Sequence, residues 1–396
     1  MSAEKEIQQQ EPEKPNQSYI SRVRLKGYKS IIDTEVTFKP GLNIIIGANG
    51  SGKTNFVEFL GTILKSQYLD KEYQASIAFY YAEQQGLYEI ERRFFRDRRR
   101  KRIILGYKEK YIFNKEIEFD TPISRSSNDL LVYDEWTALT PIIIPFSISK
   151  DFQNLHSLVK FSITEIIIID DLNNDNIIGR IYNSQTEPTS TEGINKLLEE
   201  IFLPAIKNNN RNKYENIYSL PHDFINIIKK FTPIQDIKFS PNYKVNIEEG
   251  GVEVQYLRFE FLVNGDWITW NDLSDGSKRI FYIITEVTFS NNVILLEEPE
   301  LGIHPDQLRK LMSFLREQAE EKQIIITTHS PQVLNALAAD ELDRIIIARY
   351  EKEAGTKLYH LTEEEMAHAR SYMETEGLFL SDYWVYSGFE KEEEAV

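Results

Sequence analysis

The sequence predicts an α/β fold in which a mixed sheet carries an antiparallel strand-rich lobe and an inserted, partly helical lobe. Three observations lead to this prediction. A glycine-rich segment, 47–54, connects an apolar strand to a helix. Two more apolar strands, at 293–296 and 324–326, each end in polar residues. Helical patterns at 280–289 and 305–322 precede these two strands, and strands that alternate with helices are typical of a parallel sheet.

The glycine-rich segment reads GANGSGKT and matches the phosphate-loop pattern G-x-x-x-x-G-K-T, between an apolar strand at 42–46 and a helical pattern at 55–60. Its glycines let successive backbone N–H groups surround phosphate oxygens. Lys53 would contact the β- and γ-phosphates of a nucleotide such as ATP, and the Thr54 hydroxyl would hold Mg²⁺. An ordinary glycine-rich turn is the weaker alternative. The loop consists of Gly47, Ala48, Asn49, Gly50, Ser51, Gly52, Lys53 and Thr54.

The composition is that of a globular protein. The chain has 396 residues, 41% of them hydrophobic and 27% charged. It contains no cysteine, which excludes disulfides and thiolate metal sites. No apolar run approaches the roughly 20 residues of a membrane-spanning helix, and residues 1–18 are too polar for a signal peptide. We therefore expect a cytoplasmic protein without a membrane partner.

The strand-like and helical patterns divide the chain into five segments. Residues 19–121 alternate as paired strands do, whereas the middle of the chain is rich in asparagine and contains apolar helical runs at 194–206 and 223–231. We expect a disordered tail at 1–18, the N-terminal half of the nucleotide-binding domain at 19–121, an inserted lobe at 122–245, the C-terminal half at 246–350 and a C-terminal extension at 351–396.

One short stretch, the basic run, is strongly positive although the whole chain carries a net charge of −16. It can be the solvated tip of a hairpin between strands at 87–95 and 103–107, or a patch that contacts the phosphates of DNA or RNA. A chain this acidic is not a general nucleic-acid coat protein. The basic run contains Arg92, Arg93, Arg96, Arg98, Arg99, Arg100, Lys101 and Arg102.

Glu297 and Glu298 follow the apolar strand 293–296, at the strand end where open α/β sheets bind ligands. Because adjacent strand residues point to opposite faces, one carboxylate can reach Mg²⁺ while the other faces a water that attacks the γ-phosphate. We assign Glu297 to Mg²⁺ and Glu298 to the polarisation of water. Solvated acids at a strand end would be the preferred interpretation if the phosphate loop were absent.

His329 follows the apolar strand 324–326, within the sequence TTHS. A neutral imidazole there could hydrogen-bond the γ-phosphate or the attacking water. An isolated histidine is more often structural, but this one lies one strand after the acidic pair, which favours a functional role.

Ser274 and Gly276 lie just before the helical pattern 280–289, in the sequence LSDGSKR. Ser274 is a suitable N-cap, and Gly276 keeps the turn open. The segment can be a capped helix start and nothing more, or a second phosphate-binding helix N-terminus that acts on the nucleotide of another copy.

In this order, the phosphate loop, LSDGSKR, VILLEEPE and the THS strand end resemble the motifs of ABC-type ATPases of the SMC/RecF group. The likeness is greatest to the bacterial AAA family ATPases, which include the OLD-like proteins and the ATPase subunits of the anti-phage systems PARIS, Gabija and Septu. It covers roughly 19–121 and 272–349, and it implies an ABC-type P-loop NTPase fold.

The resemblance implies ATP and Mg²⁺ as ligands and gives each matching residue a role. The phosphate loop binds ATP. Glu297 takes the place of the usual Walker B aspartate and holds Mg²⁺ together with Thr54. Glu298 matches the catalytic glutamate, and His329 matches the switch histidine.

The resemblance also implies a homodimer, or a higher homo-oligomer, that sandwiches ATP. Ser274 and Gly276 form the signature that closes on the ATP of a partner chain, and residues 301–305 match the loop that contacts the opposite subunit. The glutamine that would serve the metal and the γ-phosphate is open among Gln67, Gln74, Gln84 and Gln85.

Two family features are missing from the sequence. OLD-type nucleases carry a toprim domain, for which too few residues follow Arg349, and SMC proteins carry long heptad arms. We therefore expect an Mg²⁺-dependent ATPase that dimerises around ATP and acts as a sensor or scaffold in bacterial anti-phage defence. A separate effector or nuclease subunit would then carry out the response.

The alternative function is a DNA-repair or recombination ATPase that binds DNA directly through the basic run. A weaker interpretation is a nuclease with its active residues in the inserted lobe, where Asp170, Asp171 and Asp175 could be proposed. An asparagine- and aspartate-rich surface loop is the more common explanation for such residues.

Overall fold

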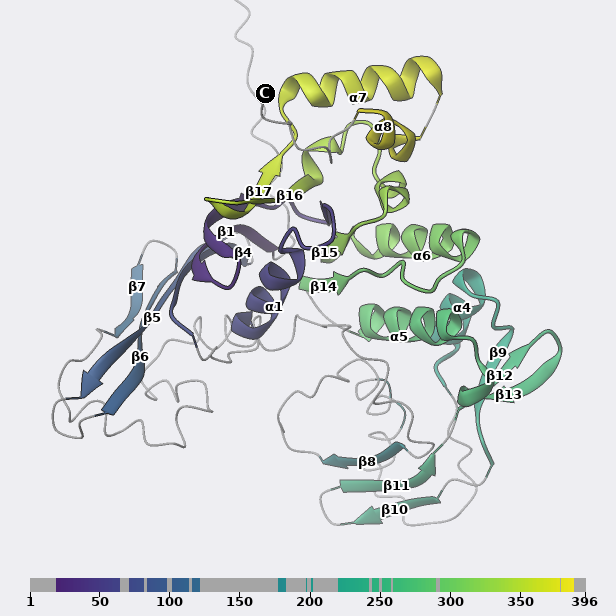
Figure 1. Cartoon of the computed structure of the whole chain (residues 1–396). Coiled ribbons are helices and arrows are strands. Elements are labelled where there is room, and N and C mark those ends of the chain that lie inside the picture. Colours follow the sequence, from purple (N-terminus) through teal and green to yellow (C-terminus); the bar gives the residue numbers. More distant parts are fainter. Residues whose placement is uncertain are drawn as a thin grey trace, which may run out of the picture.

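A mixed sheet of 11 strands runs through the molecule (Figure 1). Its order is β14-β15-β3-β16-β17-β2-β1-β4-β5-β6-β7; β14, β15, β3 and β16 are parallel, and the other neighbours are antiparallel. Its strands are β1 (Tyr19–Tyr28), β2 (Ile31–Thr37), β3 (Leu42–Ile46), β4 (Tyr73–Tyr81), β5 (Gln84–Asp97), β6 (Arg102–Phe113), β7 (Glu116–Thr121), β14 (Val293–Glu297), β15 (Gln323–Thr328), β16 (Ile345–Glu351) and β17 (Gly355–His360).

The structure is a computed structural model. The described residues are 19–64, 71–81, 84–97, 102–113, 116–121, 177–182, 197, 201, 220–241, 244–248, 251–257, 259–289, 293–377 and 379–387.

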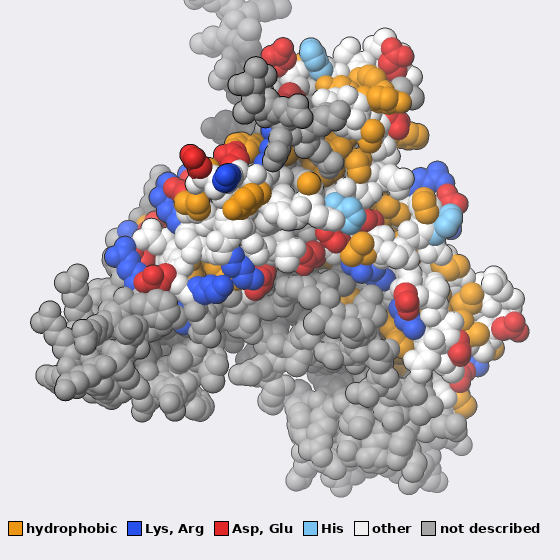
Figure 2. Space-filling view, viewed as in Figure 1, with side chains coloured by type: hydrophobic (Ala, Val, Ile, Leu, Met, Phe, Trp, Pro, Cys, Tyr) orange, Lys and Arg blue, Asp and Glu red, His pale blue; other side chains and the backbone are white. Residues whose placement is uncertain are grey.

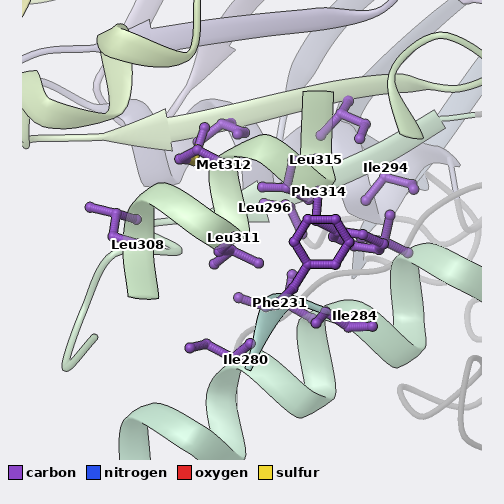
Figure 3. Close-up of a cluster of buried hydrophobic side chains, with 14 of the residues drawn as sticks. Phe231, Ile280, Ile284, Ile294, Leu296, Leu308, Leu311, Met312, Phe314 and Leu315 are labelled. Carbon is purple, nitrogen blue, oxygen red and sulfur yellow. The ribbon is translucent and has the colours of Figure 1, made fainter. Parts of the chain in front are cut away.

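Helices cover both faces of the parallel part of the sheet. α1 packs on one face through Phe56 and Leu60. α5 and α6 pack on the other face, and Figure 3 shows their side chains meeting Ile294 and Leu296 of β14. β3, β14 and β15 are buried on both faces, which accounts for their largely apolar sequences without polar–apolar alternation. The described helices are α1 (Lys53–Leu64), α4 (His222–Phe231), α5 (Asp275–Phe289), α6 (Pro305–Gln318), α7 (Glu363–Glu376) and α8 (Leu380–Ser387), with 3₁₀ helices η2 (Trp270–Asp272), η3 (Pro331–Ala336) and η4 (Leu342–Arg344).

Two three-stranded sheets lie apart from the main sheet, with the orders β10-β11-β8 and β13-β12-β9 (Figure 1). In both, a strand that precedes position 245 pairs with one that follows it, so strand pairing crosses the predicted division between the inserted lobe and the C-terminal half. This pairing does not by itself fix where one segment ends and the next begins, so the five segment boundaries stay predictions. The strands are β8 (Ile177–Tyr182), β9 (Asp236–Phe239), β10 (Lys244–Glu248), β11 (Gly251–Leu257), β12 (Phe259–Val263) and β13 (Asp266–Thr269).

The ends of two predicted helices differ from the structure. The helix expected at 280–289 begins earlier, at Asp275, because its first turn follows the N-cap directly. The helix expected at 305–322 ends at Gln318, because the next residues form turns that lead into β15. The helical run expected at 194–206 lies outside the described residues, apart from two of them that are helical.

Candidate nucleotide-binding site

The phosphate loop, residues 47–54, connects the end of β3 to the start of α1. The Gly47 N–H donates to the Thr328 carbonyl of β15, at 3.3 Å, which fixes the start of the loop to the neighbouring strand. Gly50 and Gly52 have φ values of 83° and 96°, which favour glycine. Residues 48–50 are exposed at the tip of the loop, whereas Ser51 is buried beneath them.

Two glycines of the loop are required by packing within the chain. A Cβ on Gly47 would lie 2.2 Å from the Ala348 carbonyl oxygen of β16, and a Cβ on Gly52 would lie 2.0 Å from Thr356 Oγ1 of β17. Both strands come from the far end of the sequence. The sequence indicates these glycines for phosphate contact, and it gives no signal for Ala348 or Thr356.

Lys53 is only 5% exposed, and its ammonium group lies inside the curl of the loop. Lys53 Nζ donates to the carbonyl oxygens of Gly47 at 2.7 Å and Ala48 at 3.0 Å. The ammonium is therefore held beside the loop backbone, where a positive charge can attract phosphate oxygens.

Thr54 and Glu297 meet although 243 positions separate them in sequence. The Thr54 hydroxyl, at the first turn of α1, donates to Glu297 Oε1, at the end of β14. A hydroxyl and a carboxylate are hard oxygen donors, and Mg²⁺ commonly binds to one or two carboxylates together with substrate phosphates. This pair therefore fits the Mg²⁺ that the resemblance implies.

Glu298 opens the acidic turn, residues 298–301, where the chain leaves β14. Its φ of 43° is in the left-handed region, and its N–H donates to the Thr327 carbonyl at 2.8 Å. Glu297 and Glu298 do diverge, but the expected cause, simple alternation along a strand, is wrong, because β14 ends at Glu297 and the backbone turns there.

His329 lies beside this turn, as its position one strand later suggests. Its Nδ1 is 3.3 Å from Glu298 Oε1 and 3.8 Å from Glu300 Oε1, without forming a directed hydrogen bond to either. The carboxyl ends of β14 and β15 thus bring Glu298 and His329 together, next to the phosphate loop at the end of β3.

Arg279, on α5, is a site residue that sequence reasoning missed. Its Nη2 donates to the carbonyl oxygens of Glu297 at 3.2 Å and Glu298 at 2.8 Å. Burial lowers the pKa of Arg279, while the neighbouring carboxylates act in the opposite direction. The only sequence signal was a basic residue shortly after the LSDG segment.

The segment around Ser274 and Gly276 has a structural role within its own chain. Ser274 Oγ accepts from the Ser277 N–H at 3.2 Å, which confirms Ser274 as the N-cap of α5. Gly276 is buried, and a Cβ there would lie 2.7 Å from the Gly302 carbonyl oxygen. Gly276 is therefore needed to bring α5 close to the loop that follows the acidic turn. Ser274 itself is exposed, as is Leu301, at 43%.

Several other candidate residues are not brought to this site by the described structure. Gln74 donates to Glu91, at 2.6 Å, in the β4–β5 pair. Gln84 and Gln85 lie on β5. Outside the described residues lie Gln67, Asp170, Asp171 and Asp175.

The structure corrects the expectation for Arg92, the first residue of the basic run. Arg92 is only 4% exposed, so it does not belong to a surface patch, whereas Arg93 is exposed and forms an ion pair with Glu91. The side chains from Arg96 to Arg102 lie outside the described residues. Figure 2 shows Lys and Arg side chains next to Asp and Glu side chains over the described surface of this face. In the part of the chain that the structure describes, no helix is long and apolar enough to cross a membrane.

Comparison with known proteins identifies the family. A family model described as "AAA domain, putative AbiEii toxin, Type IV TA system" matches residues 42–335. The chain is 22% identical to the Septu protein PtuA of Bacillus thuringiensis over 347 residues, which are 82% of this chain and 74% of that protein. A local match to the DNA replication and repair protein RecF of Magnetococcus marinus is 41% identical over 44 residues, 11% of this chain and 12% of that protein.

The fold has a counterpart among solved structures. The Smc head domain with an extended coiled coil, bound to the C-terminal domain of ScpA and derived from Pyrococcus furiosus, matches with a TM-score of 0.50 at 14% identity, over 90% of this chain and all of that one. That likeness supports the P-loop ATPase fold. The chain therefore belongs to the AAA-domain family whose model spans residues 42–335, and it has a P-loop ATPase fold like that of an Smc head.

Proposed function

We propose that the chain binds ATP with Mg²⁺ and hydrolyses it at the edge formed by β3, β14 and β15. Two contacts support this proposal most strongly: Thr54 donates a hydrogen bond to Glu297, and His329 lies beside Glu298. These four residues come from both ends of the family match, and folding gathers them beside one phosphate loop.

Each side chain has a distinct task in this proposal. Lys53 and the loop N–H groups bind the phosphates. Thr54 and Glu297 hold Mg²⁺, which when bound neutralises charge on the phosphates. Glu298 accepts hydrogen bonds from the attacking water and orients it, and His329 hydrogen-bonds the γ-phosphate or that water.

A second copy of the chain completes the site in this proposal. The start of α5 is exposed at Ser274, so this segment can face a partner chain, where the dipole of α5 would favour that chain's phosphates. The neighbouring loop, with Leu301 exposed, offers a surface for the same contact. The homodimer would therefore hold two ATP molecules between its subunits.

The biological role that we propose is in bacterial anti-phage defence, within the cytoplasm where ATP is available. The likeness to the Septu protein PtuA supports it, because it extends over most of both chains. The likeness to RecF is confined to a short segment and supports only the ATPase core. The chain would act as a sensor or scaffold whose nucleotide state controls a separate effector.

A phage challenge tests this role. Bacteria that carry the gene with its neighbouring genes should form fewer phage plaques, and Lys53→Ala should remove that protection because ATP is no longer held. Equal protection by a Lys53→Ala protein that has been shown not to bind ATP would contradict the role of the nucleotide. Salt-sensitive DNA binding without any protection would favour the DNA-repair alternative.

A further inference from the structure

Glu300 is a buried carboxylate that the proposed function does not use. Its side chain is 7% exposed, and one oxygen accepts a hydrogen bond from Thr328 Oγ1. The other oxygen, Oε2, is buried and has no hydrogen-bond partner among the described residues. Burying a charged group is costly unless its surroundings compensate for the lost water, so a carboxylate in this position calls for a functional explanation.

Through Thr328, Glu300 is connected to the backbone that carries His329. Thr328 Oγ1 donates to Glu300 and accepts from the Ser330 N–H at 2.9 Å. Thr328 and Ser330 are the residues immediately before and after His329, so these two hydrogen bonds hold the backbone on both sides of it. The Thr328 carbonyl also accepts from Gly47, which ties the same turn to the phosphate loop.

Glu300 also approaches the imidazole directly. Its Oε1 lies 3.8 Å from His329 Nδ1, and Glu298 Oε1 lies 3.3 Å from the same nitrogen. Two carboxylates on one side of the imidazole favour a proton on Nδ1 over a lone pair there, and so fix which edge of the ring faces the acidic turn.

The positive charge that acts on the Glu300 carboxylate comes from Arg279 of α5. The carboxylates that act on Arg279 are Glu300, Glu298 and Glu297, and its guanidinium holds the carbonyl oxygens of the last two. A buried third carboxylate is therefore compensated by a fixed cation as well as by the Thr328 hydroxyl.

We propose that Glu300 is a positioning residue for ATP hydrolysis, which orients His329 through Thr328 and through the charge of its own carboxylate. This inference rests on the proposed ATPase function. It predicts that the charge and the hydrogen bond of Glu300 affect turnover more than ATP binding.

Steady-state kinetics of Glu300→Gln test the proposal. The neutral amide keeps the shape but cannot balance Nδ1–H as a carboxylate does. We expect kcat to fall about 10- to 100-fold, the range for groups that orient a functional histidine, with ATP affinity changed less than about twofold. In a His329→Ala background the same substitution should have no further effect on kcat, because its action passes through the imidazole.

Thr328 provides a second test that does not depend on the stability of the Glu300 variant. Thr328→Val should lower kcat, and Thr328→Ser, which keeps the hydroxyl, should restore it. An unchanged kcat in Glu300→Gln, or losses that add in the double variant with His329→Ala, would overturn the role of Glu300 while leaving the ATPase proposal intact. A folded wild-type protein that does not hydrolyse ATP would overturn both.

Discussion

The phosphate loop and the acidic turn lie side by side, but their backbone conformations are stabilised by different interactions. The phosphate loop is shaped by close backbone packing, since the Cα atoms of Gly47 and Gly52 lie against Ala348 and Thr356. The acidic turn is shaped by hydrogen bonds from side chains, chiefly those of Arg279 and Thr328. The backbone shape of one half of the site therefore depends on the absence of side-chain volume at two glycines, and that of the other half depends on specific polar groups.

The polar groups around the acidic turn hold Glu298 in an unfavourable backbone conformation. A residue other than glycine in a sparsely populated backbone region costs about 1–3 kcal/mol and persists only when its surroundings enforce it. At Glu298 the backbone N–H donates to Thr327, and the carbonyl accepts from Arg279 and from the Leu301 N–H at 3.2 Å. These bonds hold Glu298 in a conformation that the isolated chain would seldom adopt.

The largest expected effect is the loss of turnover in Glu298→Gln. The amide keeps the size of the side chain but loses the negative charge that orients water, so hydrolysis should slow about 100-fold or more. ATP affinity and thermal stability should stay close to wild type, because the phosphate loop is unchanged. Enzyme assays beside equilibrium ATP binding measure both. The exposed Glu320→Gln is the matched control, and a Glu298→Gln protein with normal turnover would assign the catalytic role elsewhere.

The stability of the phosphate loop should respond to side-chain volume at its glycines. Gly52→Ala combines an unfavourable positive φ with a clash against Thr356, and we expect it to lower the free energy of unfolding by about 3 kcal/mol or more. Gly50→Ala has a similar φ of 83° but open space around the new methyl group, so it should cost about 1–2 kcal/mol. Urea denaturation of both variants measures the difference, and equal losses would mean that the contact with Thr356 contributes nothing.

A smaller effect is expected from α5. Arg279→Met removes the two hydrogen bonds to the carbonyl oxygens of Glu297 and Glu298, so the carboxylates should be held less firmly. We expect kcat to fall about tenfold, the equivalent of roughly 1.4 kcal/mol for a lost charged hydrogen bond, with little change in ATP affinity. Arg309→Met, which breaks an exposed ion pair with Asp306, is the control and should leave kcat unchanged. The proposed role of Arg279 would be wrong if both variants behaved alike.

Local patterns in the sequence were sufficient to predict the strands and motifs at the centre of the site. The apolar runs of β3, β14 and β15 indicate buried parallel strands, whose carboxyl ends meet at one edge. That geometry brings the chain segments of Glu298 and His329 to the same edge of the sheet.

Contacts between distant segments could not be predicted in the same way. Thr356 lies against Gly52 only because β17 folds back beside β16, and a threonine in such a strand has no distinguishing pattern. The burial of Glu300 depends equally on tertiary packing, since a glutamate after Glu-Pro reads as a solvated acid. The expected exposure of Arg92 was wrong, because a run of basic residues usually lies at the surface whereas this member of the run is buried.

In the proposed dimer, a working site joins the phosphate loop and acidic turn of one chain to Ser274 of a second. Mixing two inactive variants tests this arrangement. Ser274→Arg should block closure on the partner while its own loop still binds ATP, and Lys53→Ala should lose ATP binding while its Ser274 stays intact. A mixed dimer then has one site with both lesions and one with neither. We predict that ATPase activity returns on mixing, at up to half the wild-type rate per heterodimer. Inactive mixtures, despite subunit exchange confirmed by differently tagged chains, would contradict the account and show that each site is complete within one chain.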